Sequence, residues 1–164
     1  MEFYKIVIMR LCKICSAGAA LSVSLMIFII LLAILLRNVF DYSLLVVEEL
    51  VGYLLSASIF LALGPTFQKG GMIKMTIITD RLKDRSLAVL EAISLSLVFC
   101  LTIFWMRYVF RAAWRFYDRG LASNGVWPFP LWIPEVVSLF GLFALAMVLA
   151  WQCIFKFSNA IGRP

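Results

Sequence analysis

Four long runs with few charged residues dominate the sequence and fix what it can fold into. About 20 helical residues, rising about 1.5 Å each, cross the roughly 30 Å hydrocarbon core of a bilayer. Four runs are long enough to span, and they cover residues 14–36, 43–67, 87–106 and 132–155. Because 64% of the 164 residues are hydrophobic, little chain remains for a soluble domain. We predict an all-α integral membrane protein with four transmembrane helices in a single membrane domain, residues 1–164.

Lysine and arginine counts in the short connections predict the orientation. If the N-terminus is inside, ten of the 15 cations fall in inner segments and five in outer ones. Both termini are therefore predicted to be cytoplasmic, and the net charge of +6 indicates topology rather than nucleic-acid binding. The first span is too long for a signal peptide and no small-residue cleavage site follows it before Arg37, so we expect it to be retained.

Histidine and cysteine bear on the chemistry that the chain can perform. Histidine is absent, which argues against haem-ligating four-helix cytochromes and most zinc-based or histidine-based catalysis. Cys12 and Cys15 form a Cys-x-x-Cys at the inner edge of the first span, a spacing that can mark a redox or metal pair. No second pair accompanies them, which favours the alternative that they are small apolar residues on one helix face.

Two adjacent acids, Glu48 and Glu49, stand near the start of the second span. Acids inside spans are rare and usually functional, because a charge in hydrocarbon is costly. The uncharged stretch Leu50 to Phe67 nearly crosses the bilayer alone, so the pair belongs to the first turns, at the positive end of the helix dipole. Gly52, Tyr53 and Ser56 share the face of Glu49, and we predict that this polar and small stripe packs on protein rather than lipid.

Four arginines recur every four residues at the end of the third span, where they form one gently winding stripe. They are Arg107, Arg111, Arg115 and Arg119. Between the second and third spans, residues 72–85 place apolar residues at helical spacing among charged ones, which predicts an amphipathic helix on the inner interface. A plain solvated loop is the alternative. Candidates for contact with lipid are Lys74, Arg81, Lys83, Arg85, Trp105, Trp114 and Trp132, the tryptophans as members of an aromatic belt.

In this topology the charges at the outer helix ends match the helix dipoles. Arg37, Arg107 and Arg111 lie at helix C-termini, whereas Glu48, Glu49 and Glu135 lie at helix N-termini. Both sets meet at one membrane depth, which predicts a salt-bridged outer collar. The collar either pins the four helices together or turns some of its charges toward a partner.

The middles of the spans carry serines, a threonine and cysteine but no charge, unlike those of a transporter that acts alone. Nucleophile, metal-ligand and outer-loop cysteine patterns of membrane enzymes are also missing from the sequence. The chain is therefore predicted to be a non-enzymatic accessory protein that acts by forming an interface with a partner.

Several motifs occur in an order that resembles one family, from about Arg37 to Gly141. They are Arg37-Asn38-Val39-Phe40, Glu48-Glu49-Leu50 with Tyr53, Gly70-Gly71-Met72-Ile73, and Pro130-Leu131-Trp132-Ile133-Pro134. In this order and spacing the sequence resembles the small, DctQ-like membrane subunit of tripartite ATP-independent periplasmic (TRAP) transporters. Met72 departs from the histidine that the family often has there.

The resemblance implies a multi-pass subunit of the bacterial inner membrane that serves sodium-coupled import of organic acids such as C4-dicarboxylates or sialic acids. It implies two partners: a large, many-span permease subunit of the elevator type, which holds the substrate and sodium sites, and a periplasmic substrate-binding protein. The small subunit resembles a fixed scaffold, with no cofactor of its own.

Candidate residues follow from these two lines of reasoning. The partner-interface candidates are Arg37, Glu48, Glu49, Tyr53, Ser56 and Glu135, and the periplasmic docking candidates are Arg107, Arg111, Arg115 and Arg119. The competing hypothesis is a stand-alone membrane protein that handles thiols or metals through Cys12 and Cys15.

Overall fold

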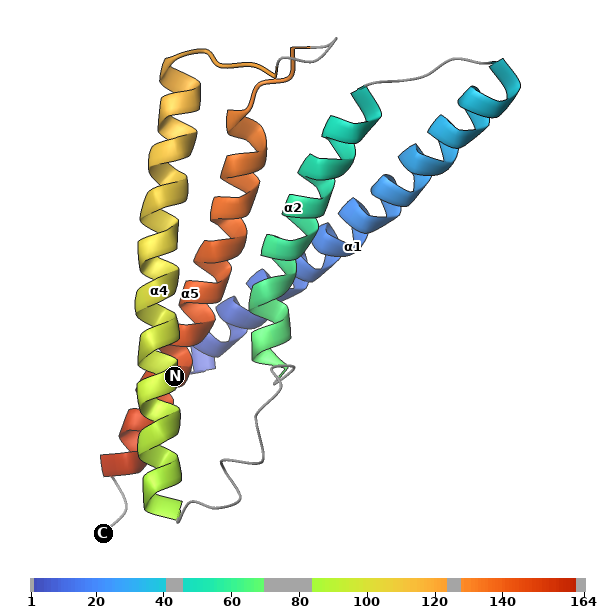
Figure 1. Cartoon of the computed structure of the whole chain (residues 1–164). Coiled ribbons are helices and arrows are strands. Elements are labelled where there is room, and N and C mark those ends of the chain that lie inside the picture. The colour runs from blue at the N-terminus through green and yellow to red at the C-terminus, as the bar shows by residue number, and fades with distance from the viewer. Residues whose placement is uncertain (1, 41–45, 70–83, 124–127, 162–164) are drawn as a thin grey trace.

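Four α-helices make up almost all of the chain that the computed structural model describes, which comprises residues 2–40, 46–69, 84–123 and 128–161 (Figure 1). The helices are α1 (Glu2–Phe40), α2 (Val46–Gln68), α4 (Asp84–Asp118) and α5 (Trp132–Ile161). Each contains a stretch long and apolar enough to cross a membrane: Ile6–Val39, Val46–Gln68, Ala92–Asp118 and Trp132–Cys153. The predicted all-α fold with four spans is confirmed.

The helices extend beyond the apolar runs that predicted them. α1 begins at Glu2 rather than near residue 14, and α4 continues to Asp118 rather than to 106. The start of α1 remains helical where it packs on α5, since Ile8 and Cys12 are buried in a cluster with Val148. α2 continues past Pro65 to Gln68, where the Lys69 amide donates to the Pro65 carbonyl at 3.1 Å.

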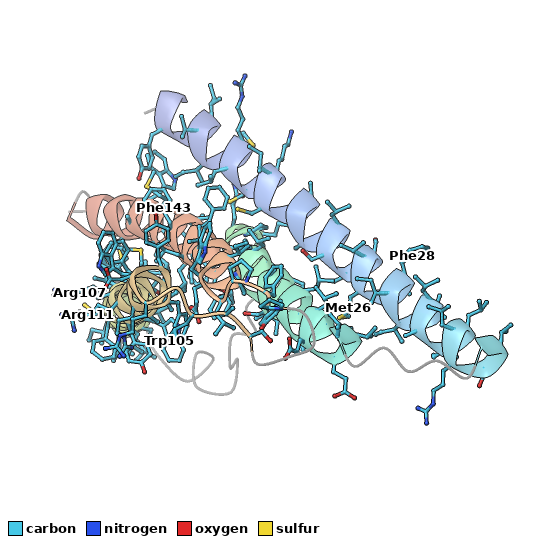
Figure 2. All side chains as sticks on the ribbon, turned by 90° about the horizontal axis from the view of Figure 1, so that it is seen from above. Met26, Phe28, Trp105, Arg107, Arg111 and Phe143 are labelled. Atoms are coloured by element: carbon cyan, nitrogen blue, oxygen red, sulfur yellow. The ribbon has the colours of Figure 1, made fainter. Side chains whose placement is uncertain are left out.

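In space the helices form a row in the order α1, α2, α5, α4 (Figures 1 and 2). α2 packs between α1 and α5, and α5 packs between α2 and α4. The start of α1 also reaches α5, where the Tyr4 ring stacks on Trp151 with centroids 5.3 Å apart. Both chain ends therefore lie at one end of the molecule, which we call the terminal end. The α4–α5 connection lies at the opposite end, which we call the loop end.

Small residues bring α2 and α5 into backbone contact. A Cβ added at Gly141 of α5 would overlap the backbone of Phe60, and one at Gly64 of α2 would lie 3.3 Å from the Leu145 amide. Close approach of this kind is how membrane helices gain packing without a hydrophobic driving force. Leu61 of α2 packs into a cluster with Cys15 of α1 and Ala144 of α5.

Fully buried side chains of α1 lie only in its terminal half; in the other half the most deeply placed residues are half-buried and recur every three to four positions, at Ser22, Met26, Ile29, Ala33 and Leu36. Ile8, Cys12, Cys15 and Ala19 are buried, whereas the half from Leu21 to Val39 exposes large apolar side chains around most of its circumference. Figure 2 shows Met26 and Phe28 on this half of the helix, Met26 on the side of α2 and Phe28 on the opposite side. The predicted interfacial helix at 72–85 begins in residues that lie outside the described part of the chain.

Candidate functional site

The first turn of α2 is tied to the α4–α5 connection. The Ser123 hydroxyl donates a hydrogen bond to the Glu49 carboxylate. Four residues further along α2, the Tyr53 ring stacks on Phe129 with centroids 5.4 Å apart. The connection between α4 and α5 is thus held against the loop end of α2 by one polar and one aromatic contact.

One turn deeper, the polar stripe of α2 meets α5 directly. The hydroxyls of Ser56 and Ser138 lie 3.3 Å apart, and the Ser138 hydroxyl donates to the Pro134 carbonyl at 2.9 Å. The prediction that the α2 stripe packs on protein is therefore confirmed at Glu49, Tyr53 and Ser56, and the protein that it packs on is this same chain. The prediction is wrong at Gly52, which is exposed and has nothing within 4 Å of an added Cβ.

The shape of the α4–α5 connection begins with a glycine that ends α4. Gly120 has a φ of 59°, in the left-handed region that other residues avoid. Its amide donates to the Tyr117 carbonyl at 3.2 Å, and the Leu121 amide donates to the Phe116 carbonyl at 3.0 Å. This pair of bonds is the Schellman arrangement, which satisfies the last helical carbonyls and reverses the chain.

The chain then pairs with itself before α5 begins. Ala122 and Pro130 form an isolated antiparallel bridge, and the Ser123 amide donates to the Phe129 carbonyl at 2.8 Å. These bonds fix the two residues that contact α2. Beside the connection, Tyr117 at the end of α4 meets Trp132 at the start of α5 edge-on, with centroids 5.9 Å apart.

The predicted charged collar does not close in the described part of the chain. Arg37, Glu48 and Arg107 are exposed, and Glu135 is half-buried. Among the side chains that the structure describes, these acids form no ion pair with an arginine or lysine. One physical reason is lateral distance, since the loop end of α1, which carries Arg37 in its last turn, lies apart from α4 and α5 (Figure 1).

The arginine stripe covers the outward face of α4. Arg107, Arg111, Arg115 and Arg119 are all exposed, and Figure 2 shows Arg107 and Arg111 on the side of α4 that faces away from α1 and α2. Beside the first two lies an open groove of about 610 Å³ between the loop-end halves of α4 and α5. It is lined by Met106, Arg107, Phe110, Arg111, Val136, Leu139, Phe140 and Phe143.

The lipid-contact candidates divide by what the structure describes. Lys74, Arg81 and Lys83 lie outside the described residues, and Arg85 lies in the first turn of α4. Trp105 and Trp114 are exposed on α4, whereas Trp132 is half-buried beside Tyr117. These three tryptophans thus lie on the loop-end half of α4 and at the start of α5.

Cys12 and Cys15 are buried as free thiols on the packed side of α1. Cys12 lies in a cluster with Ile8 and Val148, and Cys15 lies in the cluster with Leu61. Among the described residues no group of three or more histidine, cysteine, aspartate or glutamate side chains is placed to hold a metal ion. The surroundings of both thiols are those of small core residues.

Sequence reasoning missed Ser123, Phe129 and Gly141. The first two act through a loop conformation, which no periodic pattern predicts. Gly141 had a usable signal, because Gly141 and Ala144 are small residues three apart on one face of an apolar helix.

With the fold described, comparison with known protein families places the chain. The family model of the DctQ component of tripartite ATP-independent periplasmic transporters matches residues 26–157. The chain belongs to the DctQ family. Comparison with curated proteins and with solved structures gives no match. DctQ is a component of a membrane transporter, so the four apolar helices are those of a multi-pass transport subunit. The match begins within α1 and runs through α2, α4 and most of α5.

Proposed function

We propose that this chain is the small subunit of a sodium-coupled secondary transporter that imports organic acids, and that it serves as a fixed scaffold for a larger elevator-type subunit. The observation that carries the proposal is the DctQ match, which covers residues 26–157 on a four-span fold. Sodium and the substrate are assigned to the large subunit.

The packing of α2, α5 and α4 supports a scaffold role. α2 and α5 touch through their backbones at Gly141 and Gly64, so they cannot slide past one another without repacking. At the loop end, Glu49 and Tyr53 hold the α4–α5 connection in place. A subunit against which another one moves needs this kind of internal rigidity.

The loop end is proposed to face the periplasm of a bacterial inner membrane. The support is the distribution of lysine and arginine, ten inner and five outer, because cations are retained on the cytoplasmic side. In this orientation Arg115 and Arg119, in the last turns of α4 and just after it, point their charges toward the periplasm. They are proposed to dock an acidic surface of the substrate-binding protein.

The large subunit is proposed to contact the side of the molecule that carries Arg37 and Glu48. Both side chains are exposed at the loop end, while their neighbours Glu49, Tyr53 and Ser56 already have partners inside the chain. The exposed apolar side chains of the loop-end half of α1 continue this surface into the membrane.

Co-purification tests the proposal. The tagged chain, co-expressed with the genes that adjoin its own, should retain a larger multi-span protein through affinity and size-exclusion steps. Arg37→Gln should lower that yield, whereas Arg10→Gln should not; both are exposed arginines of α1, at opposite ends of the helix. A chain that purifies alone under every mild detergent tried would refute the subunit assignment. Uptake by proteoliposomes with and without a sodium gradient then tests the coupling.

A further inference from the structure

We propose that the groove between α4 and α5 binds one anionic phospholipid from the leaflet at the loop end. Its phosphate lies on Arg107 and Arg111, and the upper part of its acyl chains lies against the phenylalanines of the groove. The site needs only helices that span a membrane, so its presence is independent of any role in transport.

The first observation is the depth of the two arginines. The edge contact of Tyr117 with Trp132 marks the level at which α5 begins. Arg111 and Arg107 precede Tyr117 by six and ten residues, so their Cα atoms lie about 9 Å and 15 Å below that level. Opposite them, α5 offers only uncharged residues from Val136 to Phe143. An arginine whose Cα lies beside an apolar helix within a membrane needs an anion or water to compensate its charge.

The second observation is the geometry of the pair. Arg107 and Arg111 are one helical turn apart, and residues at that spacing have their Cβ atoms about 5–6 Å apart. Two guanidinium groups at that spacing can donate to the oxygens of one phosphate, and arginine is suited to such forked bonds. Within the described part of the chain no carboxylate pairs with either side chain.

The third observation is the polarity of the groove. Its charged groups come from α4 alone, and its remaining lining consists of Met106, Phe110, Val136, Leu139, Phe140 and Phe143. Deeper in the membrane the same side of α4 continues with exposed Phe104, Leu101 and Leu97. Nearer the loop end, Trp114 and Trp132 lie toward the membrane surface, where tryptophan concentrates. An anionic head above two hydrocarbon chains matches this order of surfaces.

Other occupants fit these observations less well. Free phosphate would satisfy the arginines but leave the apolar walls uncovered. An acidic helix of a partner protein would cover the ridge of α4, whereas a flexible acyl chain conforms more completely to an open groove between two helices.

Native mass spectrometry of the full chain in mild detergent tests the site. The wild-type chain should retain added phosphatidylglycerol in preference to phosphatidylcholine, and an excess of inorganic phosphate should not displace it. Arg107→Gln with Arg111→Gln should weaken retention about tenfold or more, because charge-assisted bonds to the phosphate are lost. Arg115→Gln with Arg119→Gln removes the same charge from the α4 stripe beyond the groove, and should leave retention unchanged.

A second variant separates a groove from general attraction to a charged surface. Val136→Trp keeps both arginines but fills the recess, and it should also release the lipid. Circular dichroism and size exclusion identify variants that fail to fold. Equal retention by the wild type and the Arg107→Gln, Arg111→Gln variant would overturn the site, and so would equal losses in both arginine pairs. Loss of a co-purified partner without loss of lipid would assign the groove to an acidic partner helix instead.

Discussion

Glu49, in the first turn of α2, accepts a hydrogen bond from Ser123, which lies 74 residues further along the chain in the α4–α5 connection. The sequence predicts an ion pair for Glu49, but in the structure this acid contributes to packing within the chain. The adjacent acid, Glu48, is exposed. Two neighbouring glutamates therefore have different roles, and they form a matched pair for experiment.

Loss of the Glu49 contact should weaken the loop end. Glu49→Gln and Ser123→Ala should each lower the free energy of unfolding by about 1 kcal/mol, the typical net value of one hydrogen bond. Glu49→Gln leaves a neutral acceptor and so weakens the bond that Ser123→Ala removes; because both variants act on the same bond, their combination should cost less than the sum. Chemical denaturation of the chain in detergent, followed by circular dichroism, measures the cycle.

Glu48→Gln is the control for that cycle, since it removes an equal charge one residue away. It should leave the free energy of unfolding unchanged within about 0.5 kcal/mol, as most surface substitutions do. Additive effects of Glu49→Gln and Ser123→Ala would show that the two side chains are not coupled.

Gly141 should tolerate no side chain. Gly141→Ala places a Cβ against the backbone of Phe60, which cannot yield as a flexible side chain could, so α2 and α5 must separate. We expect a loss of about 1–3 kcal/mol, the usual cost of overpacking. Gly52→Ala is the matched control, because nothing lies within 4 Å of its added Cβ. Thermal unfolding of both variants in one detergent compares them, and equal melting temperatures would contradict the backbone contact.

The arginines at the end of α4 should govern docking of the binding protein. Arg115→Glu with Arg119→Glu should raise the KM of uptake for the loaded binding protein by about tenfold or more, because like charges then face each other across the contact. The wild-type KM should itself rise with salt, since exposed charges are screened. Asp118→Asn, in the same turn, should leave the KM unchanged or lower it. An unaltered KM in the double variant would remove these residues from the docking surface.

Substitution of the buried thiols should spare function. Cys12→Ala with Cys15→Ala should retain co-purification of the large subunit and substrate uptake, at some cost in stability from the two small cavities. Cys12→Ser with Cys15→Ser should behave similarly, since a helical serine can donate to a carbonyl one turn back, as Ser22 does to Gly18 at 2.9 Å. Loss of uptake in a well-folded double variant would instead support a functional role for the thiols of Cys12 and Cys15.

The sequence predicted the features that depend on local composition. Spans follow from the cost of placing charge in hydrocarbon, and the α2 stripe of Glu49, Tyr53 and Ser56 follows from helical spacing. The order of the helices in the row could not be predicted from the sequence, because a helix that is apolar on all sides has no periodic pattern that indicates which face packs on a neighbour. The expected collar failed in part for that reason: at the loop end, α2 separates Arg37 of α1 from Glu135 of α5.

The loop contacts could not be predicted for a different reason. Ser123 and Phe129 reach α2 only because Gly120 reverses the chain and Ala122 pairs with Pro130. Those are long-range consequences of one turn geometry. Gly120 and the prolines predict a turn, but they do not indicate which helix the connection packs against.

The splay of α1 gives the molecule unequal areas in the two halves of a bilayer. Near its start α1 lies close to α5, while its other end stands apart from α4 and α5 (Figure 1). The chain therefore displaces more lipid from the leaflet at the loop end than from the other, much as a wedge does. Lateral pressure in that leaflet acts on the loop-end half of α1, so bilayer thickness and acyl-chain packing become variables that set its tilt.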